Sequence, residues 1–298
     1  MKRIPILLYS ILLMLLCGCT PAAAPARVAA TTLPVYELTS RICAGTPISV
    51  SRLVTEQVSC LHDYSLNVRQ VKAAESAELI VISGAGLEEF MEDVLHDAQI
   101  IDASHGIPLI CPEDAHHDHA EPVEEHSHEG HHHEQDPHIW LSPINAMVMA
   151  ENICRELATR YPEYADLFSS NLQALLTDLE TLHTYGKQQL ETLSCRELIT
   201  FHDGFAYFAA TYDLTILEAV EEESGSEASA KELIHLIEEV SHHNLPAIFT
   251  EVSGSVSAAG IISRETGASS HALDMAMAGD SYFDAMYHNI DTIKEALQ

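Results

Sequence analysis

The eight residues LIVISGAG, numbers 79–86, decide the fold class of this chain. Leu79–Ile82 is a continuous apolar run, which is typical of a parallel strand that is buried on both faces. Gly84 and Gly86 directly after it predict a tight turn from the strand into a helix over Leu87–Asp97. A dinucleotide-binding turn would carry a third glycine where Glu89 stands, so the sequence favours a purely structural turn.

The alternation of strands and helices continues on both sides of this stretch. The sequence predicts strands over Val28–Thr32, Ile48–Val54 and Ile100–Ile101, and helices from Pro34 to Gly45 and over Val68–Ser76. Strands that alternate with helices in this way form parallel sheets. The residues up to about Pro112 therefore form a first α/β lobe.

A helical segment from about Pro143 to Leu193 follows, and Pro162 divides it into two helices or bends one long helix. The alternation then restarts, with predicted strands over Leu198–Phe201, Thr215–Ala219, Ala247–Glu251 and His271–Leu273, and helices over Gly204–Thr211, Ala230–His243, Val256–Thr266 and Tyr282–Leu297. The predicted fold is therefore α/β, with two lobes that have parallel-rich sheets flanked by helices and are joined by a long linking helix.

The composition favours a protein that meets metal ions. The 298 residues include 14 Lys and Arg against 45 Asp and Glu, a net charge of −31, together with 19 histidines. So acidic a chain is a poor partner for nucleic acid or for an anionic membrane surface. No Lys or Arg occurs between Ala73 and Cys154, so this stretch favours cations.

The N-terminus has the features of an export signal. Lys2 and Arg3 precede an apolar run, Ile4–Leu16, that is too short to span a bilayer comfortably. The run ends in LCGC, residues 16–19, which resembles the lipobox of bacterial lipoproteins, with Cys19 as the lipidated residue. We expect an extracytoplasmic protein, anchored by lipid at the outer face of the plasma membrane or in the periplasm; an ordinary signal peptide cut nearby is the alternative.

The remaining five cysteines are less informative. They are Cys43, Cys60, Cys111, Cys154 and Cys195, an odd number without a CxxC pair. Sequence alone assigns no disulfide among them. Cys60 lies two residues before His62 and could be a metal ligand, although a buried or disulfide-bonded role is commoner for such a cysteine.

Residues 115–135, AHHDHAEPVEEHSHEGHHHEQ, are unlike the rest of the chain. This low-complexity stretch predicts a disordered surface loop. Its eight histidines are expected to bind several metal ions weakly, and the alternative is a solvated spacer: His116, His117, His119, His126, His128, His131, His132 and His133. A metalloprotease helix of the HExxH type is excluded, because Pro137 stands where the second histidine is required.

Four single residues stand near predicted strand ends or beside this loop. His62, His138, His202 and Asp274 follow the second strand, the polar loop, the strand Leu198–Phe201 and the strand His271–Leu273. Ligands of open α/β sheets bind beyond the carboxyl ends of the strands. We therefore expect the four to converge on a metal ion in the cleft between the lobes. Taken singly, each residue is more often a hydrogen-bonded loop histidine or a helix-capping aspartate, and their joint placement is what favours the metal site.

Five motifs resemble one protein family over nearly the whole chain after the export signal. They are HDYSL at 62–66, ISGAGLE at 82–88, DPHIWLSP at 136–143, FHDGFAYF at 201–208 and FTE at 249–251. Together they resemble the metal-binding lipoproteins of bacterial ABC importers that capture zinc or manganese, and the histidine-rich loop is typical of the zinc branch. In that family the histidines of the HDY, DPH and FHD motifs are the ligands, which implies His62, His138 and His202 here.

The resemblance also bears on the fourth ligand and on the metal. Asp274 matches an acidic ligand of many members, whereas the glutamate that some zinc members use has its place taken by Leu61. Three imidazoles with one carboxylate or water suit tetrahedral Zn²⁺, while Mn²⁺ needs more oxygen ligands. Manganese-binding members tend to carry glutamate where His202 stands. Asp63, Asp203 or Glu251 could hold an imidazole N–H.

The resemblance implies a receptor that binds zinc outside the cytoplasm and delivers it to an ABC permease with a cytoplasmic ATPase. We expect a monomer without a catalytic step; the alternatives are a receptor for manganese or another divalent metal, a zinc hydrolase and an adhesin. The expected division is a signal peptide over residues 1–18, a tether over 19–27, an N-terminal lobe over 28–141, a linking helical segment over 142–193 and a C-terminal lobe over 194–298.

Overall fold

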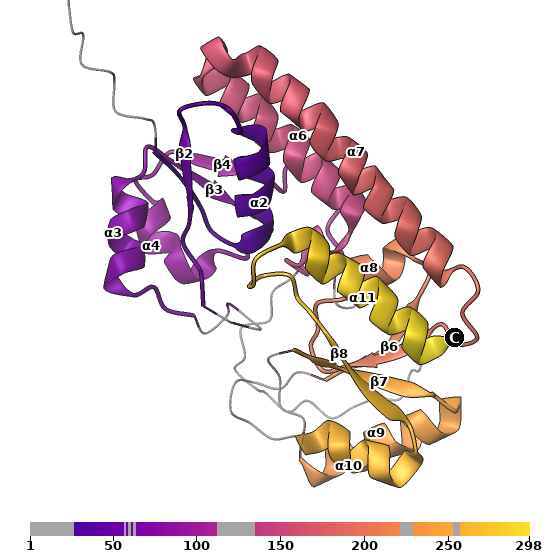
Figure 1. Cartoon of the computed structure of the whole chain (residues 1–298). Helices are drawn as coiled ribbons and strands as arrows, with labels where there is room; N and C mark the ends of the chain where they lie inside the picture. Colours follow the sequence, from indigo (N-terminus) through magenta and orange to yellow (C-terminus); the bar gives the residue numbers. More distant parts are fainter. Residues whose placement is uncertain are drawn as a thin grey trace, which may run out of the picture.

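Two parallel four-stranded sheets, each covered by helices, form the chain (Figure 1). The computed structural model describes residues 27–56, 58, 61, 64–111, 135–220, 229–252 and 257–298. The first sheet has the order β2-β1-β3-β4, and its strands are β1 (Arg27–Ala30), β2 (Ser49–Arg52), β3 (Leu79–Ile82) and β4 (Ile100–Asp102). The second has the order β6-β5-β7-β8, with β5 (Glu197–Thr200), β6 (Thr215–Ala219), β7 (Ala247–Glu251) and β8 (Ser269–Leu273). Every predicted strand is confirmed, and the predicted fold class with it.

The turn after β3 is held by its own residues. Gly84, Ala85 and Gly86 have φ of 84°, 55° and 87°, and the two glycines adopt such left-handed angles without strain. A Cβ atom on Gly84 would stand 2.0 Å from Asp102 Oδ1, so a side chain would not fit there. The carboxylate of Glu88 accepts hydrogen bonds from the N–H groups of Ser83 and Gly84. The structural turn that the sequence favoured is confirmed.

The helix predicted over 87–97 is shorter than expected. A 3₁₀ turn, η1 (Glu89–Met91), precedes the four-residue helix α4 (Glu92–Leu95). Met91 interrupts the helix with a φ of −128°, and its side chain is buried against Ile80 of the sheet. Burial of Met91 therefore overrides the helical pattern of the segment.

Opposite faces of the first sheet meet different helices. Val28, Leu79 and Val81 face α2 (Leu33–Ile42) and the long helices, whereas Ala29 and Ile80 face α3 (Val68–Ser76) and α4. The start of α3 has a capping box, in which Asn67 and Gln70 satisfy backbone N–H groups that the helix leaves free. The central strands β1 and β3 are thus covered on both faces, as the continuous apolar sequence of β3 predicts, whereas the edge strands β2 and β4 keep exposed residues.

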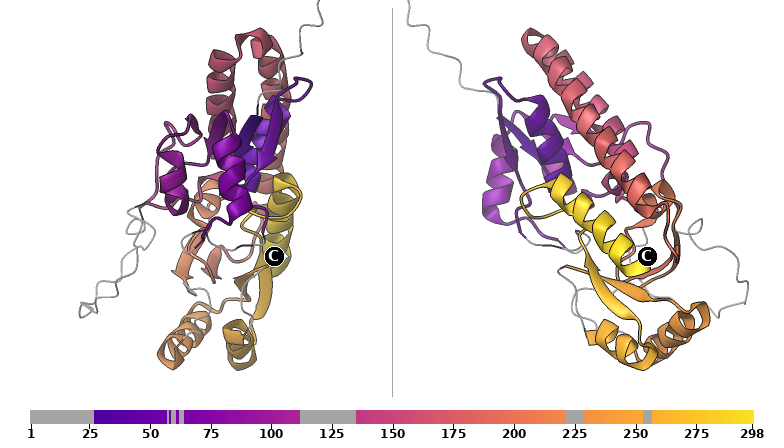
Figure 2. Two further views of the ribbon diagram at one scale, coloured as in Figure 1. Left: turned by 90° about the vertical axis from the view of Figure 1, so that its left-hand side faces the viewer. Right: turned by 45° about the vertical axis from the view of Figure 1, so that its right-hand side comes forward.

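Two long helices connect the sheets (Figures 1 and 2). They are α6 (Pro143–Arg160) and α7 (Ala165–Leu190), separated by the 3₁₀ turn η3 (Pro162–Tyr164), and they pack along each other. Pro162 therefore divides the helical segment into two helices, and α7 provides the long link to the second sheet. In the described part of the chain no helix is both long and apolar enough to cross a membrane.

The second sheet is also covered on both faces. Helices α9 (Ala230–His243) and α10 (Ser257–Thr266) lie on one face. The other face meets α7, α8 (Ala206–Thr211) and α11 (Tyr282–Leu297). One hydrophobic core runs from the first sheet through the helices to the second, and Trp140 and Tyr282 are among its largest fully buried side chains. The two lobes therefore share a packed interior.

Candidate metal centre

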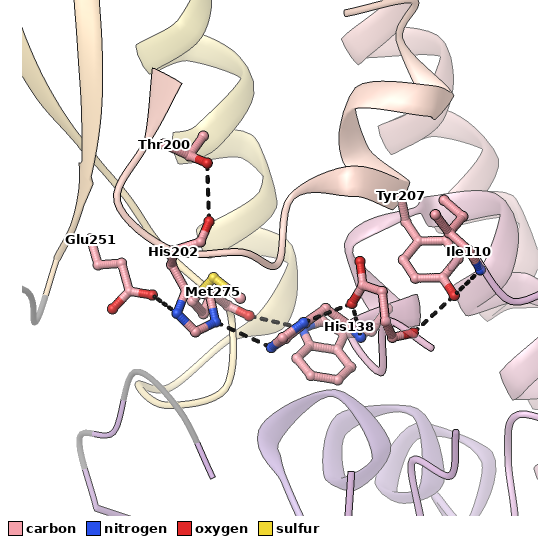
Figure 3. Close-up of polar contacts among 9 residues, drawn as sticks. Ile110, His138, Thr200, His202, Tyr207, Glu251 and Met275 are labelled. Atoms are coloured by element: carbon pink, nitrogen blue, oxygen red, sulfur yellow. Dashed lines mark hydrogen bonds and ion pairs between the residues drawn. The ribbon is translucent and has the colours of Figure 1, made fainter. Parts of the chain in front are cut away.

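Two of the predicted ligands, His138 and His202, face each other between the sheets (Figure 3). His202 follows the carboxyl end of β5, and His138 precedes the 3₁₀ turn η2 (Ile139–Leu141). Their Nε2 atoms are 3.3 Å apart, and the rings are nearly perpendicular at 84°. His138 is only 2% exposed. The tertiary structure thus joins two histidines that are 64 residues apart in the sequence.

The separation of these two nitrogens fits a shared cation. Zn–N bonds of about 2.0–2.1 Å at a tetrahedral angle place two nitrogen ligands about 3.3–3.4 Å apart. The observed 3.3 Å between the Nε2 atoms agrees with that value. The two imidazoles could therefore bind one zinc ion with little movement of either ring.

A buried carboxylate orients His138. Asp136 Oδ1 lies 2.8 Å from His138 Nδ1 and also accepts the backbone N–H of His138 at 2.8 Å. With the proton on Nδ1, the lone pair is on Nε2 and faces His202. Asp136 was not among the residues predicted for this role, although its position two residues before the histidine in Asp-Pro-His was the available signal.

A second carboxylate takes the same position behind His202. Glu251, the last residue of β7, places Oε1 3.1 Å from His202 Nδ1 and is 6% exposed. Glu251, one of the three acidic residues considered for this role, thus lies beside His202, and Asp63 lies outside the described residues. Each imidazole has a carboxylate at Nδ1, which is the usual arrangement behind metal-binding histidines.

Asp274 follows β8, as predicted, but its own contacts lie elsewhere. Its Oδ1 accepts the N–H of Ala276 at 2.8 Å, and its backbone N–H donates to Asn289 Oδ1 at 2.7 Å. Within the described residues it bonds to neither imidazole. The side chain of Met275 lies close to the pair, because a Cβ on Gly204 would stand 2.5 Å from Met275 Cε and 2.8 Å from His202 Cδ2.

The remaining predicted site residues lie outside the described residues. These are His62, Cys19 and the eight histidines of the loop 115–135. Within the part of the chain that is described, no three His, Cys, Asp or Glu side chains converge so as to hold a metal ion. The structure therefore brings together His138 and His202, and the roles of His62 and Asp274 stay predictions.

Hydrogen bonds join the His138 segment to the C-terminal lobe. The indole Nε1 of Trp140 donates to the carbonyl of Met275 at 2.8 Å, and the hydroxyl of Tyr282 donates to the carbonyl of Trp140 at 2.8 Å. Trp140 has no exposed surface, and its ring contacts the His138 ring edge-on. These bonds hold His138 in place relative to the lobe that carries His202.

The described cysteines are free thiols. They are Cys43, Cys111, Cys154 and Cys195. Burial, together with the nearby Cys154, raises the pKa of Cys43 to about 12. A thiol with so high a pKa stays protonated at neutral pH, whereas metal binding needs the thiolate. The histidine pair therefore remains the candidate centre.

Comparison with known proteins supports the resemblance seen in the motifs. Residues 28–296 match the family described as zinc-uptake complex component A, periplasmic. The zinc-binding lipoprotein AdcA of Streptococcus pneumoniae is 28% identical over 315 aligned residues, which cover 99% of this chain and 61% of AdcA. The chain thus spans about three fifths of the length of that relative.

Two further relatives match along most of their own length. A Treponema pallidum protein described as metal-binding is 29% identical, over 87% of this chain and 83% of its own. A crystal structure of ZnuA superposes with a TM-score of 0.75 at 29% identity, covering 91% of this chain and 99% of that one. The chain belongs to the family of zinc-uptake complex component A, periplasmic.

Proposed function

We propose that this chain is an extracytoplasmic receptor that binds Zn²⁺ between its two lobes and passes it to an ABC permease. The observation that carries the proposal is the pair of Nε2 atoms 3.3 Å apart, each ring having a carboxylate at Nδ1. Such a pair presents two neutral nitrogen donors to one cation. The family and its zinc-binding relatives support the same conclusion.

The proposed ligand set is His62, His138, His202 and Asp274. The geometry of His138 and His202 supports these two members of the set. His62 and Asp274 are supported by family resemblance, His62 through the HDYSL motif and Asp274 through its position after β8. Three imidazoles and one carboxylate would give the tetrahedral nitrogen-rich site that zinc prefers.

The described carboxylates favour zinc over manganese. Asp136 and Glu251 each place a carboxylate at the Nδ1 side of one ring of the imidazole pair. To become metal ligands they would have to leave these positions. The pair therefore offers nitrogen ligands rather than carboxylate oxygens. Since Mn²⁺ prefers oxygen ligands, this favours zinc.

We infer that the site binds its ion without a chemical step. A hydrolase of this type would need a general base beside an open metal position. The two buried carboxylates are each held by an imidazole instead. Assay of the zinc-loaded protein for ester and peptide hydrolysis tests this point, and turnover that is lost in His202→Ala would contradict it.

The route of delivery rests on the N-terminus and on the family. A lipid on Cys19 would keep the receptor beside its permease, and the relative AdcA is described as a lipoprotein. The partner is proposed to be a permease powered by a cytoplasmic ATPase, with a single receptor chain presenting each ion. The loop 115–135 is proposed to bind additional ions weakly, because ordering a polar segment offsets part of the binding free energy.

Zinc titration calorimetry on three variants tests the proposal. The wild-type chain should show one tight zinc ion and several weak ones. His202→Ala should weaken the tight ion at least about 100-fold, since losing an outer partner alone costs about 10-fold to 100-fold. Deletion of residues 116–133 should remove weak ions only.

The matched control is His96→Ala, which removes an exposed histidine whose side chain pairs with Asp97 among the described residues. This variant should leave the affinity of the tight zinc ion and the number of weakly bound ions unchanged. Should the deletion abolish tight binding while His202→Ala leaves it intact, the primary site lies in the loop and the proposal is refuted.

A further inference from the structure

Tyr207 bonds to both chain segments that meet beside the histidine pair (Figure 3). Its hydroxyl donates to the carbonyl of Asp136 at 2.9 Å and accepts the N–H of Ile110 at 3.0 Å. Asp136 and Ile110 are themselves joined, since the N–H of Asp136 donates to the carbonyl of Ile110 at 2.8 Å. One buried hydroxyl on α8, a helix of the second lobe, thus closes a three-membered network with two segments of the first lobe.

The same Asp136 controls the orientation of His138. Its carbonyl bonds to Tyr207, its N–H bonds to Ile110, and its carboxylate bonds to His138 Nδ1. Because the N–H and the carbonyl of Asp136 are both hydrogen-bonded, the backbone from which its side chain extends is held in place. The direction in which His138 presents Nε2 therefore depends on the Tyr207 hydroxyl through a single intervening residue.

A second bond from α8 reinforces this arrangement beyond His138. The Oγ atoms of Thr211 and Ser142 are hydrogen-bonded at 2.8 Å, and Ser142 caps the start of α6. Tyr207 and Thr211 lie one helical turn apart, since Thr211 Oγ1 also bonds to the carbonyl of Tyr207. The helix α8 thus holds the chain on both sides of His138.

We propose that Tyr207 is the positioning residue of the zinc ligand His138 and acts on it through Asp136. The inference rests on the proposed function, because it assigns His138 to zinc. A metal site requires its ligands within about 0.5 Å and 10–20° of the binding geometry. Tyr207 supplies that accuracy from the lobe that also carries His202.

Tyr207→Phe is the direct test, because it keeps the ring and removes only the bridging oxygen. Zinc affinity, measured by competition with a chelator, should fall about 10-fold to 100-fold, as for other residues behind metal ligands. The matched control is Tyr212→Phe. Tyr212 is also buried and follows the same helix, but its hydroxyl has no hydrogen-bond partner among the described residues. Tyr212→Phe should leave zinc affinity unchanged.

A double-mutant cycle separates positioning from general loss of structure. If Tyr207 acts through Asp136, Tyr207→Phe should have little further effect on zinc affinity in an Asp136→Ala background. The visible spectrum of bound Co²⁺ should change in Tyr207→Phe and stay as in the wild type in Tyr212→Phe. Additive losses in the cycle, or equal effects of the two tyrosine changes, would overturn the inference.

The zinc titration of the wild type distinguishes failure of the proposed zinc binding from failure of the role of Tyr207. If the wild-type chain shows no tight zinc, the proposed function fails first. If it binds zinc tightly and Tyr207→Phe does so equally well, only the role of Tyr207 is wrong. Should Tyr207→Phe not fold by circular dichroism, Asp136→Ala alone decides, since unchanged zinc affinity there would remove the route through which Tyr207 acts.

Discussion

Replacement of Glu88 by Gln should change how stability depends on pH. Glu88 is 4% exposed and accepts hydrogen bonds from Thr31 Oγ1 at 2.6 Å, Ser83 N–H at 2.8 Å and Gly84 N–H at 3.0 Å. Burial raises the pKa of Glu88 from 4.5 to about 7, against the lowering effect of these bonds, and the nearby Asp102 adds to the rise. Between pH 4.5 and about 7, the folded chain therefore holds a proton at Glu88 that the unfolded chain has released.

The sign and size of the effect follow from this pKa. Between pH 4.5 and 7 the folded state binds more protons at Glu88, so the free energy of unfolding should fall as pH rises. The rise of the Glu88 pKa from 4.5 to about 7, at about 1.36 kcal/mol for each pH interval of one, amounts to about 3 kcal/mol across the window. Below pH 4.5 the contribution is fully present, and above pH 7 it is lost.

Urea unfolding at several pH values would measure the effect. Subtracting the curve of Glu88→Gln from that of the wild type cancels the other titrating groups and should leave a drop of about 3 kcal/mol from pH 4.5 to 7.5. Glu92→Gln, at an exposed carboxylate in the first turn of α4, is the control and should run parallel to the wild type. Parallel curves for Glu88→Gln as well, or a wild-type chain that gains stability over this window, would refute the reasoning.

Three further predictions concern binding, anchoring and packing. Zinc affinity should fall steeply between about pH 7 and pH 5, because imidazoles must lose a proton to bind metal; a flat profile in chelator competition would indicate carboxylate ligands. Cys19→Ala should move the protein from the membrane fraction to the soluble fraction, and retention in the membrane would argue against the lipid anchor. Trp140→Phe loses the hydrogen bond to the carbonyl of Met275 and should lower the free energy of unfolding by about 1–3 kcal/mol in denaturant titration. An unchanged midpoint of unfolding would show that this bond does not stabilise the fold.

Local pattern determined the elements of this fold. The strand Leu79–Ile82 and the helices Val68–Ser76 and Tyr282–Leu297 have the predicted bounds, because an apolar run or a helical period is a property of neighbouring residues. The sequence also placed His202 and Asp274 just after strands, since the ends of strands can be read from the same pattern. His138 could be selected from the Asp-Pro-His motif beside it.

Only the tertiary structure decided what these residues contact. The 3.3 Å between the two imidazole nitrogens, the pairing of Glu251 with His202 and the bond from Tyr207 to Asp136 all join residues that are far apart in the chain. The shortened helix at Met91 has the same origin, because the side chain is drawn into the face of the sheet. Periodicity reports which side of an element is buried, whereas the partner and the distance depend on how whole elements pack.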